Sequence, residues 1–188
     1  MVNIMKDILL YEKIPMHLEK KNFDYKFQNY ITENTLHTHW HEHLELLYFR
    51  SGNCTFYCDD ESFNVQCGDL VFINSAEVHY FEVHECVDYF CLILYPDFFY
   101  NNDYENIKIK NHIGFDKYID ECMTNINAEY LTNSIGSDLM IRSYSNSLLA
   151  YLMRNYPDES TQPDDPELHA ENLKRLNTVF EYISDNYN

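Results

Sequence analysis

Two stretches of the sequence constrain the fold more than any other feature. His37–Gly52 reads HTHWHEHLELLYFRSG, and Gly68–His79 reads GDLVFINSAEVH. Residues two apart in a β-strand point the same way, so alternate histidines of the first stretch can share one face with Glu45. Another histidine, His79, follows the turn and strand of the second stretch. We therefore expect three imidazoles and one carboxylate to meet at one point inside a small β-barrel.

This group of side chains has the chemistry of a metal site. Imidazole and carboxylate groups bind divalent zinc, nickel, iron and manganese, and such a set leaves coordination positions for water or substrate. We expect the groups that contact a small molecule, and that hold any metal, to be His39, His41, Glu45 and His79. His37 and His43 are surplus, and we interpret them as supporting or surface groups. The alternative is a strand that is simply polar, with each imidazole solvated or bonded to the backbone.

The charge of the chain limits its partners. Thirteen Lys and Arg residues face thirty-one Asp and Glu residues, which gives a formal net charge of −18. Such a polypeptide is repelled by phosphate backbones and anionic membrane surfaces. We therefore expect it to bind neither nucleic acid nor membrane by itself.

Targeting signals and common catalytic motifs are absent from the sequence. The sequence contains no uncharged apolar run long enough to span a membrane and no signal peptide, so we expect a cytoplasmic location. The six cysteines should then be free and mostly buried thiols, since none forms a CxxC pair. The sequence also lacks GxSxG, GxGxxG, HExxH and a Walker-type loop, which argues against hydrolase and nucleotide-binding functions.

The pattern of apolar residues predicts strands followed by helices. Short alternating runs separated by turn signals extend from Phe23 to Tyr95 and are typical of an antiparallel sandwich or jelly roll. After Pro96 the spacing becomes helical, which predicts two amphipathic helices of about 17 and about 20 residues. Their apolar faces are carried by Phe115, Ile119, Cys122 and Ile126, and by Ile141, Tyr144, Leu148 and Leu152. These faces either pack on the barrel or pair with a second copy of the chain.

The end of the chain reads as a linker and one more helix. Residues 157–167, PDESTQPDDPE, combine prolines with acidic side chains and cannot bury enough surface to order themselves. Beyond them, Leu173, Leu176, Phe180, Ile183 and Tyr187 trace a helical face that has no partner in the sequence. The simplest interpretation is that this helix opens a further domain.

The same residues carry a resemblance to a known family. His39-x-His41-x3-Glu45-x6-Gly52, followed by Gly68–His79, resembles the two cupin motifs. Both stretches look like the N-terminal sensor domain of AraC-type bacterial transcription regulators. The resemblance implies a barrel that binds an effector, a helical pair that forms a homodimer, a linker, and a basic DNA-binding domain whose first helix resembles residues 173–187. Three motif positions depart from the enzyme cupins: Glu33, Ser75 and Val83.

We therefore predict a mainly β fold, a cupin (jelly-roll) antiparallel barrel followed by a helical pair. The expected segments are an N-terminal arm (1–22), the effector-binding barrel (23–96), a helical dimerisation region (97–156), an acidic linker (157–170), and the first helix of a DNA-binding domain otherwise missing from the chain (171–188).

The expected function follows from these segments. We predict the non-enzymatic sensing and dimerisation domain of an AraC-type regulator, with a sugar or other small polar metabolite as effector. DNA would be bound only through the domain missing from this chain. The alternatives are a free-standing metal-dependent cupin enzyme, an isomerase or dioxygenase, and a sensor of the metal itself.

Overall fold

The structure is a computed structural model that describes most of the barrel and both long helices. The described residues are 10–12, 23–31, 38–84, 86–99 and 108–158, together with 171, 172, 174, 175, 178, 179 and 182. Most of the predicted arm, nearly all of the predicted linker, His37 and Glu33 lie outside the described residues. Among the described residues, no helix is long and apolar enough to cross a membrane.

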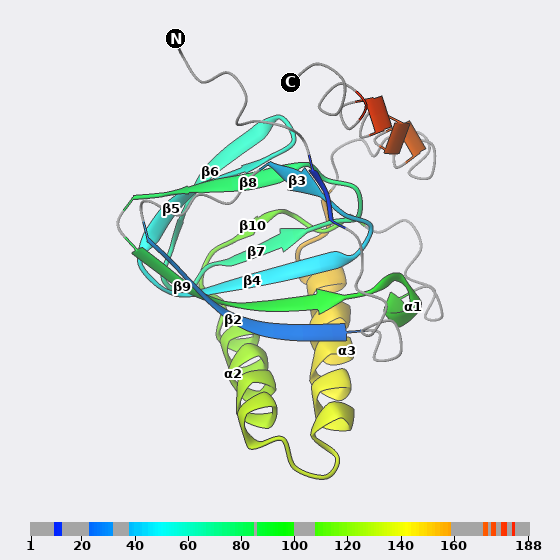
Figure 1. Ribbon diagram of the computed structural model, residues 1–188. Coiled ribbons are helices and arrows are strands. Elements are labelled where there is room, and N and C mark those ends of the chain that lie inside the picture. The colour runs from blue at the N-terminus through cyan, green and yellow to red at the C-terminus, as the bar shows by residue number, and fades with distance from the viewer. Residues whose placement is uncertain are drawn as a thin grey trace.

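Two five-stranded sheets face each other and form the barrel (Figure 1). One sheet has the order β1 (Leu10–Tyr11), β3 (His39–Trp40), β8 (His79–Val83), β5 (Asn53–Cys58) and β6 (Glu61–Gln66). The other has the order β10 (His112–Ile113), β7 (Leu70–Ile73), β4 (Leu44–Ser51), β9 (Cys86–Leu94) and β2 (Phe23–Ile31). All neighbouring strands are antiparallel except β1 and β3, which run parallel. The predicted jelly-roll barrel is confirmed.

Strand β4 shows why the sequence folds this way. Leu47 and Phe49 point between the sheets, while Leu46 and Tyr48 point to the opposite face, as their alternation predicts. Both faces are buried, because the far side of this sheet is covered by helices. At the end of the strand, Gly52 turns the chain with φ of 79° and lies so close to the Cys86 carbonyl that no side chain fits.

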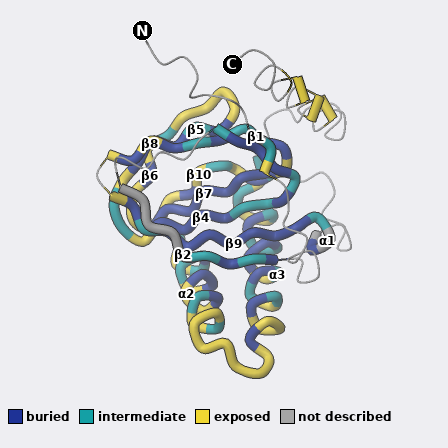
Figure 2. Tube along the Cα trace, viewed as in Figure 1, coloured by how far each residue is buried: buried dark blue, intermediate teal, exposed yellow. Residues whose placement is uncertain are grey.

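The helical pair packs on the outer face of the β10-β7-β4-β9-β2 sheet (Figure 2). After the short α1 (Pro96–Phe99), α2 spans Lys117–Thr132 and α3 spans Ser137–Asn155. Asp116 begins α2 by accepting hydrogen bonds from the backbone N–H groups of Tyr118 (2.7 Å) and Ile119 (3.2 Å). Because the helix starts after this cap, Phe115 is not on its apolar face as predicted; it is 67% exposed.

The buried faces of both helices match the remainder of the predicted pattern. Ile119, Cys122 and Ile126 of α2 are buried, as are Ile141, Leu148 and Leu152 of α3. The turn that joins the helices is exposed, and so are the apolar side chains near it (Figure 2). The cysteines are free, and four of the six are buried, as expected.

A candidate metal and ligand site in the barrel

The four predicted site residues come together inside the barrel. His39 lies on β3 and pairs with His79 on β8, while Glu45 reaches the same point from β4 in the opposite sheet. His41 follows β3 directly. One potential ligand atom from each residue can be chosen so that all four lie within 4.8 Å of one another. The imidazoles of His41 and His79 are fully buried.

Backbone contacts fix which nitrogen of each histidine faces this point. His41 Nδ1 donates to the carbonyl of His43 at 3.1 Å, and His79 Nδ1 donates to the carbonyl of Glu77 at 3.0 Å, since a carbonyl only accepts. In a neutral imidazole the other nitrogen, Nε2, then carries a lone pair. These Nε2 atoms lie 3.0 Å (His41) and 3.6 Å (His79) from the same oxygen of Glu45, Oε2.

Lone pairs that face a carboxylate need a positive charge between them. His79 Nε2 is buried without a hydrogen-bond partner among the described residues, which is costly unless a bound group satisfies it. A divalent metal would bind every one of these atoms, and backbone-bound Nδ1–H groups are the usual support of histidine ligands. The donor set therefore fits a divalent metal, and His39, His41, Glu45 and His79 would hold it.

The electrostatics of Glu45 agree with a charged carboxylate. Burial acts to raise the pKa of Glu45, but the neighbouring imidazoles of His41 and His79 outweigh burial and hold this pKa well below its usual range. Cys91 on β9 donates its thiol to Oε1 of Glu45 at 2.9 Å. Burial raises the pKa of Cys91, so this cysteine is a neutral donor. Cys91 was not among the site residues predicted from the sequence, although the alternation of β9 places it on the inward face with Tyr89 and Ile93.

The surplus histidine His43 is not at the surface, where one of our two interpretations placed it. Its side chain is buried, stacks on the ring of His41 with centroids 3.5 Å apart, and meets Tyr95 edge-on. The chain leaves strand geometry between His41 and His43, so the residues do not follow the alternation assumed for a continuous strand. His43 is not one of the four clustered donors.

Segments from both ends of the chain contact the rim of this site. Glu12 Oε2 lies 3.6 Å from His39 Nε2. Tyr11 donates a hydrogen bond to Glu42, the residue between His41 and His43. Lys174, from the region of the predicted last helix, forms an ion pair with Glu42 and lies over the Tyr11 ring at 5.9 Å. The described residues 171, 172, 174, 175, 178 and 179 are helical.

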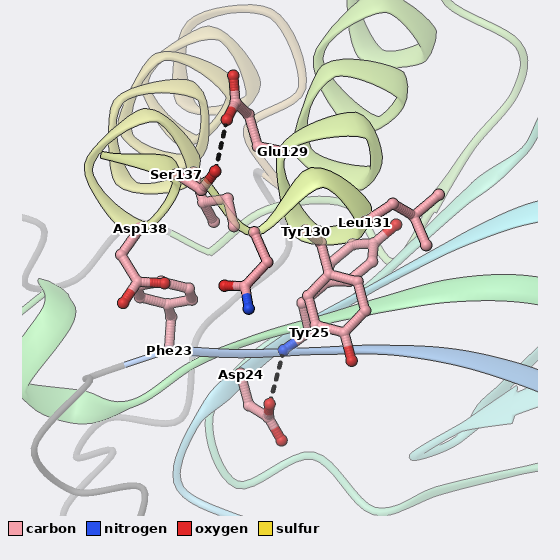
Figure 3. A pocket seen from close by; sticks show the side chains of 10 residues that line it. Phe23, Asp24, Tyr25, Glu129, Tyr130, Leu131, Ser137 and Asp138 are labelled. Atoms are coloured by element: carbon pink, nitrogen blue, oxygen red, sulfur yellow. Dashed lines mark hydrogen bonds between the residues drawn. The ribbon is translucent and has the colours of Figure 1, made fainter. Parts of the chain in front are cut away.

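A cavity lies outside the barrel, between β2 and the ends of α2 and α3 (Figure 3). Its volume is about 500 Å³, and Phe23 and Tyr25 contribute aromatic rings from β2. Glu129 accepts a hydrogen bond from Ser137 at 2.9 Å across the two helices beside it. This cavity contains none of the four predicted site residues.

Comparisons with solved structures return cupins. The chain is similar to a cupin with a double-stranded β-helix fold from Methanocaldococcus jannaschii (12% identity, 39% of this chain and 71% of that chain, TM-score 0.37). It is also similar to a cupin 2 conserved barrel protein from Rhodopseudomonas palustris (19%, 39% and 52%, 0.37). A third is described as a predicted oxalate decarboxylase from Thermotoga maritima (16%, 44% and 75%, 0.39).

Comparison of the sequence with protein families identifies the family of the chain. No curated protein matches it. Residues 20–130, more than half of the chain, match the family described as the AraC-like ligand binding domain. This range contains all of the clustered histidines and Glu45 together with most of α2. The chain therefore belongs to the family of AraC-like ligand binding domains.

Proposed function

We propose that this chain is the effector-binding and dimerisation part of an AraC-type transcription regulator. The observation that carries the proposal is the cluster of His39, His41, Glu45 and His79, buried inside the barrel of an AraC-like ligand binding domain. In our proposal the cluster holds a divalent metal, to which a sugar or other small polar metabolite binds without being transformed. A regulator of promoter DNA acts in the cytoplasm, where we place it.

The helical pair supports the proposed homodimer. Its inner face packs against the sheet, but apolar side chains remain exposed around the α2–α3 turn. Leu131 and Leu139 are each 72% exposed, and Ile135 is fully exposed. Water-exposed apolar side chains gathered at one end of a molecule are typical of an interface. A two-fold contact between two such ends would cover them.

The contacts at the rim of the site support a route from effector to DNA. Glu42 lies between His41 and His43 and pairs with Lys174, beyond the predicted linker. In our proposal residues 171–188 open the DNA-binding domain, so an effector that moves the 41–43 turn changes how that domain is held. Such couplings are commonly about 1 to 3 kcal/mol.

The proposal is tested with the product of the whole coding sequence that contains these residues, in promoter-binding assays with a panel of sugars and hydroxy acids. We expect one class of compound to alter DNA affinity in the wild type. His79→Ala should abolish that response and retain basal DNA binding, whereas His84→Ala, at an exposed histidine just beyond β8, should retain the response. A protein that ignores promoter DNA, or that converts the compounds to products, would contradict the proposal.

A further inference from the structure

His43 is a buried polar side chain without a hydrogen-bond partner. It is 2% exposed, and neither Nδ1 nor Nε2 has a partner among the described residues. Buried ring nitrogens that lose water and gain no partner destabilise a fold, and an apolar ring of the same shape would avoid this cost. The position of His43 therefore indicates that a bound molecule, and not a group of the protein, supplies the hydrogen-bond partner of its ring.

The place of His43 in the barrel indicates what that partner contacts. Its ring lies parallel to that of His41, with an interplanar angle of 11° and centroids 3.5 Å apart. His41 in turn faces Glu45 and the rest of the four-donor cluster. His43 is therefore separated from the four-donor cluster by the thickness of one stacked ring.

His43 offers a neutral donor and a neutral acceptor. A neutral imidazole ring carries one N–H and one lone pair, so it can donate one hydrogen bond and accept another. A divalent metal held by three neutral imidazoles and one carboxylate keeps one net positive charge, which favours an anionic oxygen ligand.

We propose that His43 is a ligand-binding residue, and that the ligand is a small carboxylate with a second oxygen nearby, such as a 2-hydroxy acid. The carboxylate of the ligand would bind the metal, and the hydroxyl oxygen beside it would accept a hydrogen bond from the His43 ring. This inference rests on the proposed function, because it requires that the cluster hold a metal to which an effector binds. It narrows the effector from small polar metabolites to chelating acids.

The experiment compares two probes on the Co²⁺-loaded protein: glycolate, which carries a 2-hydroxyl group beside its carboxylate, and acetate, which lacks that hydroxyl. Visible absorption of Co²⁺ reports metal binding and ligand binding separately. We expect His43→Phe, which keeps a flat stacking ring, to weaken glycolate binding about tenfold, the upper end of the range for loss of one hydrogen bond. Its Co²⁺ and acetate affinities should change less than about twofold. His43→Gln should restore part of the glycolate affinity, and His84→Phe is the control.

The metal-free proteins provide a second measurement. If His43 serves only the ligand, His43→Phe should melt at the wild-type temperature or above it, because a buried unsatisfied group has been removed. A lower melting temperature would show a structural role and overturn the proposal. Unchanged glycolate affinity in His43→Phe would also overturn the proposal, and is the result expected if a buried water satisfies the ring. A loss of Co²⁺ affinity as large as the loss of glycolate affinity would overturn it too.

Failure of this inference can be told apart from failure of the proposed metal site. If the wild type binds no Co²⁺, the proposed metal site is wrong, and so is the inference about His43 that depends on it. If the wild type binds Co²⁺ but not glycolate, the proposed ligand class is wrong and the metal site stands. If wild type and His43→Phe bind glycolate alike, only the role of His43 is wrong.

Discussion

The substitution Glu45→Gln tests the metal site most directly. Glu45 supplies the single negative charge of the cluster, and His41 and His79 both face its Oε2 atom. Glutamine keeps the shape of the side chain but removes the charge that compensates a divalent cation. Lost supporting groups weaken metal binding about 10- to 100-fold, and loss of a charged ligand should reach the upper end of that range.

The magnitude follows from linkage between metal binding and unfolding. At a free Zn²⁺ concentration 100 times the wild-type Kd, binding stabilises the folded state by about 2.7 kcal/mol. For a chain of this length, that is an increase in Tm of roughly 5 to 11 °C. If Glu45→Gln weakens binding about 100-fold, the same concentration equals the variant's Kd, and the gain falls to about 0.4 kcal/mol, or roughly 1 °C.

The assay is thermal unfolding of each protein in EDTA and in buffered Zn²⁺, and the increase in Tm between the two is compared. Each variant is its own reference, so any effect of the substitution on the metal-free fold cancels. Glu82→Gln is the matched control, because Glu82 is an exposed carboxylate on β8, the strand that carries His79. A Zn²⁺-dependent increase of equal size in wild type and Glu45→Gln would refute the assignment of Glu45 as a ligand.

Three further predictions concern the fold and the proposed dimer. Gly52→Ala should destabilise the barrel by roughly 2 to 4 kcal/mol in denaturant titrations, because its Cβ would lie 1.7 Å from a backbone oxygen; Gly136→Ala, with positive φ but open space, should cost only about 1 kcal/mol. Asp116 has a lowered pKa, because its hydrogen bonds, led by that from the Tyr156 hydroxyl, outweigh the effect of burial. The resulting stabilisation is present above the unfolded-state pKa, near 3.9, and is lost as the pH falls through the folded-state pKa. The free energy of unfolding of Asp116→Asn should therefore fall less steeply than that of the wild type as the pH decreases below about 4. An unchanged pH dependence in this range would contradict the assignment. Leu139→Asp should shift the sedimentation of the proposed homodimer to that of a monomer, whereas a dimer that persists would locate the interface elsewhere.

The sequence predicted those parts of the molecule whose structure depends on local repetition. Residues 44–49 of β4 keep the two-residue alternation, so the packing of Leu46 and Leu47 on opposite faces of the sheet followed from the pattern alone. The cluster of four donor side chains was predictable because the two sequence motifs fix which strands carry them. The burial of His43 was not, since it arises where the chain departs from strand geometry between β3 and β4.

The elements that the sequence did not reveal are the shortest ones. β1 and β10 have two residues each, too few to show a period, and both exist because a neighbouring strand offers free backbone groups. Phe115 was misplaced for a related reason. Its spacing matches the helical face, but the cap at Asp116 starts the helix after it, and spacing does not report caps.

The turn between β7 and β8 links the candidate site to the end of α3. Its Glu77 carbonyl holds His79 Nδ1, while the buried Glu77 carboxylate binds Lys108 at 3.1 Å and Asn111 at 2.5 Å. Residues 108–110 pair in turn with residues 156–158, where the chain leaves α3. One short turn thus orients a candidate metal ligand and anchors the segment that precedes the predicted linker. The Glu77 turn, residues 108–110 and residues 156–158 thus form one continuous series of polar contacts between a candidate metal ligand and the end of α3.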